Sequence, residues 1–269
     1  MMKAIHKMAL FLIGATLFFA CIERVPITNR RQFSVVPESE LISMSLTQYT
    51  SFLQSNPTLS ANDTRSAQVQ RVGAKIQAAV ESYFASIGKS SRLSGYAWEF
   101  NVVDDKAVNA WCMPGGKVVV YTGLLPVTQG DAGLAIVLGH EIGHAVARHG
   151  NERMSEALAI QFGSSVLQVA LDAKSEQTQY LFMQSFGIAS QLGMLAYSRQ
   201  HELEADKLGL VFAAMAGYDP REALVFWKRM SENAGAKPPE LLSTHPSDER
   251  RIEEISKYLP EALKYYQGN

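Results

Sequence analysis

The chain has 269 residues, of which 47% are hydrophobic, and its formal net charge at neutral pH is −1. This length allows one large globular core, and the near-neutral charge argues against a nucleic-acid-binding protein. Two cysteines are too few for the disulfide framework of a small secreted domain. Cys112 is expected to be a small buried hydrophobic residue rather than a reactive or metal-binding thiol.

The N-terminus has the pattern of a secretory signal peptide. Two lysines precede an apolar run over residues 8–19, which is short for a membrane span. Cys21 follows a small residue, so we expect residues 1–20 to be removed and Cys21 to be acylated, as in a bacterial lipoprotein. Plain secretion and an uncleaved anchor remain alternatives, because two bulky phenylalanines stand just before the expected processing site.

The remaining residues predict mainly helices. Residues 21–37 contain two prolines and a polar turn, so they are expected to be a membrane-proximal linker, and residues 38–269 are expected to be one domain. Apolar spacing, capping residues and breakers predict helices over 38–52, 62–86, 128–149, 198–216, 220–230 and 247–259. Alternating and valine-rich segments predict strands over 96–103 and 117–121. The predicted fold class is α+β, mainly helical.

A His-Glu-x-x-His pattern occurs in one of these helices, at His140-Glu141-Ile142-Gly143-His144. Positions i and i+4 share one face of a helix, so both imidazoles can reach one metal ion. Glu141 lies about 100° further round the helix, where it can take a proton from an attacking water molecule. Nitrogen ligands together with a carboxylate are typical of a catalytic zinc site, so we expect one Zn²⁺ per chain.

The residues around this pattern are uncharged, which predicts a buried helix. Gly139 and Gly143 are poor helix formers, so they indicate that a neighbouring segment packs closely there.

A third ligand is expected outside this helix. His149 is rejected, because five residues rotate a helix by about 140° away from His144, and a cation at the helix C-terminus explains it better. Glu202 and Asp206 share one face of a later helix, so Glu202 can bind the metal while Asp206 accepts a hydrogen bond from a liganding histidine. His201 remains a rival ligand. The neighbouring carboxylate at position 204 is expected to be solvated.

Several motifs resemble those of one metallopeptidase family. The zinc pattern, followed by Ser198-Arg199-x-x-Glu202-x-x-Ala205-Asp206, is similar to the metallopeptidases related to the CAAX prenyl protease type I and the HtpX heat-shock protease. Within that family the chain most resembles the periplasmic bacterial members and the mitochondrial inner-membrane quality-control protease. Supporting motifs are Val25-Pro26-Ile27-Thr28, Arg30-Arg31-Gln32, Asn109-Ala110, Pro114-Gly115-Gly116, Val120-Tyr121-Thr122-Gly123-Leu124 and Thr244-His245-Pro246-Ser247.

The resemblance implies a zincin-like catalytic domain whose small β-sheet has an edge strand beside the active-site helix. It implies Glu202 as the third zinc ligand and Asp206 as the partner of a liganding histidine. It also suggests that His245 stabilises the tetrahedral oxyanion, with an ordinary turn residue as the alternative. An extended substrate would pair with the sheet edge near Asn109, Gly115, Gly116 and Val118.

The sequence therefore predicts a zinc-dependent endopeptidase of the bacterial cell envelope. It would be a periplasmic protein, anchored by a lipid at Cys21 to the outer membrane of a Gram-negative bacterium. Its substrates would be unfolded or misassembled envelope proteins, which it would cleave in quality control. A non-proteolytic binding module and a small-molecule zinc hydrolase are the alternatives. Glu141 argues against the first, because binding needs no base, and the strand-like edge argues against the second. Residues 152–197 are expected to form helices, as a lid or as ordinary core.

Overall fold

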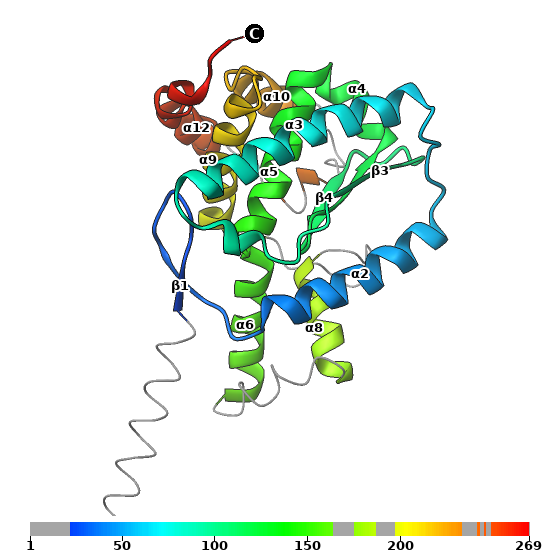
Figure 1. Cartoon of the computed structure of the whole chain (residues 1–269), viewed down its shortest axis with the longest axis vertical. Coiled ribbons are helices and arrows are strands. Elements are labelled where there is room, and N and C mark those ends of the chain that lie inside the picture. The colour runs from blue at the N-terminus through cyan, green and yellow to red at the C-terminus, as the bar shows by residue number, and fades with distance from the viewer. Residues whose placement is uncertain are drawn as a thin grey trace, which may run out of the picture.

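The computed structural model describes residues 22–163, 175–186, 197–232, 241–242, 245 and 249–268. Two helices, α5 (Asp131–Ala147) and α9 (Arg199–Met215), pack against each other in the middle of the molecule (Figure 1). Both carry long runs of buried residues, and their apolar side chains belong to one large core. The predicted α+β, mainly helical fold class is confirmed.

A small three-stranded sheet lies beside α5. Its strands are β3 (Glu99–Val103), β5 (Lys117–Tyr121) and β4 (Ala110–Met113), in the order β3-β5-β4. The central strand β5 is parallel to β3 and antiparallel to β4, and β4 contacts α5 (Figure 1). The predicted strand over 117–121 is confirmed, whereas β4 was not predicted, because four residues are too few to show an alternating pattern.

The other helices surround the central pair and the sheet. Helix α3 crosses α5 and β3, while α10 and α12 pack on α5 and α9 from the other side (Figure 1). Their bounds are α2 (Glu38–Ser55), α3 (Thr64–Ser86), α4 (Leu125–Thr128), α6 (His149–Phe162), α8 (Glu176–Phe186), α10 (Glu222–Glu232) and α12 (Glu249–Ala262). Short 3₁₀ turns cover Ser90–Leu93, Thr122–Leu124 and Leu263–Tyr265.

The first metal-motif helix ends earlier than predicted. Arg148 adopts a left-handed conformation with φ of 63°, which separates α5 from α6. The Arg148 side chain forms ion pairs with Glu23 at 2.7 Å and with Glu38 at 3.3 Å, and these contacts hold the bend. A helix running on through His149 was expected, so the bend changes where the His149 side chain lies.

The predicted close packing at the two glycines of α5 is confirmed. A Cβ atom on Gly139 would lie 2.8 Å from the backbone oxygen of Gly209, and one on Gly143 would lie 2.9 Å from that of Ala205. Real Cβ atoms do not approach a backbone oxygen so closely, so only glycine allows α5 and α9 this separation.

Residues 22–33 form an antiparallel hairpin of β1 (Ile22–Arg24) and β2 (Arg31–Phe33), where an extended linker was expected. The hairpin contacts α6 through β2. None of the described helices is long and apolar enough to cross a membrane. The expected signal peptide over 1–20 and the acylated Cys21 lie outside the described residues, and the expected single domain over 38–269 stays a prediction.

The described parts of the segment 152–197 pack as ordinary core. Met154 and Leu158 of α6 and Leu181 and Phe182 of α8 are buried in one hydrophobic cluster. Residues 164–174 and 187–196, where a lid was the alternative, lie outside the described residues, as does Ser247, the expected cap of the last helix.

Candidate metal centre

Four buried side chains bring donor atoms together between α5 and α9. They are His140, His144, Glu202 and His245, whose donor atoms all lie within 4.8 Å of one another. The Nε2 atoms of His140 and His144 are 3.1 Å apart, and His140 Nε2 is 3.2 Å from His245 Nδ1. Glu202 Oε1 lies 2.9 Å from His245 Nδ1 and 3.4 Å from His144 Nε2.

These separations fit a metal ion. Donors that each lie 2.0–2.1 Å from a tetrahedral zinc ion are about 3.4 Å from one another. The chemistry fits as well, because burial lowers the pKa of His144 well below its usual value and leaves the ring neutral. Although burial raises the pKa of Glu202, the charges of His245 and Arg251 hold it well below its usual range, so the carboxylate is ionised.

Asp206 orients the first of these histidines. Its Oδ1 lies 2.9 Å from His140 Nδ1, so His140 donates its Nδ1 hydrogen to Asp206 and keeps the Nε2 lone pair facing the other donors. Arg251 of α12 donates to both oxygens of Asp206, at 2.7 and 2.8 Å. It also pairs with Glu202 Oε2 at 2.9 Å and stacks on the Trp227 ring.

His144 has a different partner. Its Nδ1 lies 2.9 Å from His149 Nδ1, and His149 Nε2 lies 3.1 Å from Glu204 Oε2. The expectation of a cationic His149 is wrong, because the ring is fully buried and burial lowers its pKa to about 4. The expectation of a solvated Glu204 is also wrong, since only 3% of the residue is exposed. The rival ligand His201 lies outside the donor cluster and contacts Glu152 at 3.0 Å.

Glu141 lies beside the donors without being one of them. Its Oε1 atom is buried, has no hydrogen-bond partner, and is 3.6 Å from His245 Nε2. Burial is the main cause that raises the pKa of Glu141 to about 7. A carboxyl group with that pKa can accept and return a proton near neutral pH.

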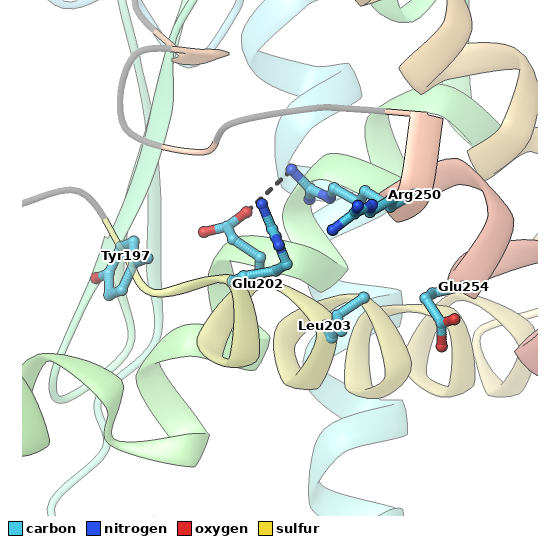
Figure 2. Close-up of a pocket in the computed structure, with 7 residues that line it drawn as sticks. Tyr197, Glu202, Leu203, Arg250 and Glu254 are labelled. Carbon is cyan, nitrogen blue, oxygen red and sulfur yellow. Dashed lines mark ion pairs between the residues drawn. The ribbon is translucent and has the colours of Figure 1, made fainter.

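A pocket of about 180 Å³ opens next to Glu202. Figure 2 shows Glu202 between Tyr197 on one side and Arg250 on the other, with Leu203 and Glu254 along the wall. The dashed line in Figure 2 is the ion pair of Glu202 with Arg251.

The four residues that were predicted to form the substrate edge do not all lie on an edge strand. Val118 belongs to the central strand β5, is fully buried and pairs with β3 and β4 on its two sides. Gly115 and Gly116 form the turn between β4 and β5, both with positive φ. Asn109 directly precedes β4, and its backbone oxygen accepts from Tyr121. In the order β3-β5-β4, β4 is therefore one of the two edge strands, and it contacts α5.

Sequence reasoning missed three supporting residues, Arg251, His149 and Glu204. Arg251 follows Arg250 in a charged segment, and no local feature distinguishes the buried arginine from the exposed one. His149 and Glu204 meet only because the chain bends at Arg148.

The sequence matches the model of peptidase family M48 over residues 70–259. The chain is 34% identical to the mitochondrial metalloendopeptidase OMA1 of Schizosaccharomyces pombe, over 94% of this chain and 71% of that protein. It is 31% identical to the human mitochondrial metalloendopeptidase OMA1, over 94% of this chain and 49% of that protein. The β-barrel assembly-enhancing protease of Escherichia coli is 27% identical over 58% of this chain and 33% of its own length.

These matches correct two expectations. The two relatives named above that align over 94% of this chain are mitochondrial, whereas the bacterial relative named above aligns over 58% of it. The expected bacterial cell-envelope function and the periplasmic, lipid-anchored location at the outer membrane are therefore wrong. The metallopeptidase prediction is confirmed, because the His-Glu-x-x-His helix and the donor cluster both lie inside the matched region. The chain belongs to peptidase family M48.

Proposed function

We propose that this chain is a zinc-dependent endopeptidase that cuts extended segments of unfolded proteins. The observation that carries the proposal is the buried cluster of three imidazoles and one carboxylate with a second buried carboxylate, Glu141, beside it. Relatives that are named metalloendopeptidases and align over 94% of the chain support it.

His140, His144 and Glu202 would hold the ion. A zinc ion bound there would polarise the scissile carbonyl and acidify water. Glu141 would take the proton of the attacking water and deliver it to the leaving amine. Its buried position suits this role, because its pKa lies near neutral pH.

His245 is placed for one of two roles. Its Nδ1 atom stands among the donors, so it could occupy the fourth coordination position that a catalytic zinc site keeps for water. Its Nε2 atom faces Glu141, so it could also stabilise the oxyanion, which is the role that we propose.

We further propose that the substrate pairs with β4. Asn109 directs its carbonyl towards β5, and alternation in an antiparallel pair then turns the carbonyls of Ala110 and Cys112 away from β5. No described strand pairs with β4 on that side. An added strand would read the extended backbone rather than a particular side chain, which suits unfolded proteins.

The testing experiment compares the purified full chain with Glu141→Gln on casein, with bound zinc quantified in both. Loss of the base should lower cleavage by about 10²–10⁴-fold while zinc remains bound. Glu81→Gln, the same change at an exposed position of α3, is the matched control and should cut normally. Should both wild type and Glu141→Gln hold zinc and neither cut, the chain would be a binding module. Cleavage of small esters or amides alone would favour a small-molecule hydrolase.

A further inference from the structure

We infer that Arg30, in the N-terminal hairpin, is a positioning residue for the metal ligand His144 and acts on it through Glu204 and His149. The inference rests on the proposed role of His144 as a ligand. It connects a segment before the family-matched region to the centre of the site.

The two contacts that connect Glu204 to His144 through His149 determine which nitrogen carries each hydrogen. The ionised carboxylate of Glu204 can only accept hydrogen bonds, so His149 donates its Nε2 hydrogen to Glu204 across the 3.1 Å contact. The Nδ1 atom of neutral His149 is then an acceptor, and His144 must donate its own Nδ1 hydrogen across 2.9 Å. The Nε2 atom of His144 keeps its lone pair, which is the atom that faces His140 and Glu202.

Arg30 binds the carboxylate of Glu204, on which this placement of the hydrogens on His149 and His144 depends. Its Nε atom donates to Glu204 Oε1 at 2.9 Å and its Nη2 atom to Glu204 Oε2 at 2.9 Å. Thr28 of the same hairpin donates to Glu204 Oε1 at 2.7 Å. The other edge of the guanidinium binds Glu152 with two further hydrogen bonds, at 2.5 and 2.6 Å. Both carboxylates are buried, and this one cation pairs with both of them.

The two histidine ligands are therefore supported from opposite ends of the chain. His140 is oriented by Asp206, which is itself bound by Arg251 of α12, near the C-terminus. His144 is oriented by His149, which contacts Glu204, and Glu204 is bound by Arg30 near the N-terminus. Direct partners of liganding histidines typically contribute 10–100-fold to metal affinity. Arg30 acts on such a partner, His149, through Glu204, so loss of Arg30 should weaken zinc binding although Arg30 does not touch the site.

The test compares Arg30→Ala with Arg31→Ala. Arg31 is the exposed neighbour in the same hairpin, so both changes remove one positive charge. Zinc affinity is measured by competition with a chelator, and the ligand geometry by the visible absorption of the Co²⁺-substituted protein. We expect Arg30→Ala to bind zinc at least about 10-fold more weakly and to change the Co²⁺ spectrum, while Arg31→Ala matches wild type. Arg30→Lys, which keeps the charge without the planar fork, should recover only part of the affinity.

Glu204→Gln is the second variant, and it tests the positioning of His144 if Arg30→Ala does not fold. It keeps the volume but removes the charge that Arg30 binds, and its amide can donate as well as accept, so His149 is no longer obliged to donate from Nε2 and zinc affinity should again fall. Wild-type zinc affinity and Co²⁺ spectrum in Glu204→Gln, or in a folded Arg30→Ala, would overturn the inference. A wild-type protein that binds no zinc would instead overturn the proposed function.

Discussion

At the scale of single residues, three of the four donors of the candidate metal centre contact a polar side chain outside the donor set. Asp206 hydrogen-bonds to His140, His149 hydrogen-bonds to His144, and Arg251 forms an ion pair with Glu202. These partners set the tautomers of His140 and His144 and keep the Glu202 carboxylate ionised. The donors are thus oriented towards one another by the protein itself.

His245→Ala tests the role of the fourth histidine. If His245 stabilises the oxyanion, cleavage of casein should fall by about 10²–10³-fold while bound zinc stays near wild type. Activity and zinc content measured on the same preparations check this. A rise in activity would contradict the oxyanion role and indicate that His245 occupies the position of the attacking water.

At the scale of elements, the site depends on how closely α5 and α9 approach. Gly143 lies against Ala205, one residue before the partner of His140, and Gly139 lies against Gly209. The two helices carry three of the four donors, so their separation sets the distances within the cluster.

Gly143→Ala should therefore damage both stability and metal binding. The added Cβ would meet the Ala205 carbonyl at 2.9 Å, and overpacking of this kind costs about 1–3 kcal/mol. Thermal unfolding of the metal-free protein and chelator competition are the measurements. Wild-type values in both would show that the helices can separate without moving the donors.

The open edge of β4 gives a prediction on the substrate side. Peptide substrates that are N-methylated at alternate backbone amides cannot complete a strand pairing. We expect KM to rise when the methyl groups replace the amide hydrogens that face β4. KM should change little when the methylated positions are shifted by one residue along the peptide. Equal KM values for the two series would argue against an added strand.

At the scale of the whole molecule, buried charges connect segments that are far apart in the chain. Arg30 reaches Glu152 of α6 and Glu204 of α9, and His201 of α9 also contacts Glu152. The hairpin is thereby attached to α6, which follows the His-Glu-x-x-His helix, and to α9, which carries Glu202.

This ion pairing makes a prediction for stability against pH. Burial raises the pKa of Glu152, but hydrogen bonds from Arg30 and His201 outweigh it and lower the pKa to about 2. The folded pKa lies below the unfolded one, so the stabilisation is complete above about pH 4.5 and is lost as the pH falls towards 2. A shift of this size corresponds to roughly 3 kcal/mol at about 1.4 kcal/mol per pKa unit.

Denaturant unfolding of the metal-free protein at a series of pH values measures this effect. Glu152→Gln should lose less stability than wild type between about pH 5 and pH 3, because the substituted side chain does not titrate. Glu81→Gln should follow wild type. Parallel curves for wild type and Glu152→Gln would show that Glu152 does not contribute.

Much of this protein was determined by local sequence. The helix spacing placed His140 and His144 on one face, Ser198 caps α9 as its hydroxyl accepts from the His201 amide, and the glycines of α5 indicated a close neighbour. These features depend on residues within one or two turns of a helix, so the sequence contains the whole signal.

Only the tertiary structure decided how α5 and α9 meet and which side chains surround the donor cluster. The bend at Arg148 depends on carboxylates more than a hundred residues earlier in the chain, and it brings His149 against His144. Arg251 and Arg30 come from opposite ends of the chain. Their roles depend on long-range burial, which selects one arginine over its equally charged neighbour, and no local pattern carries that information.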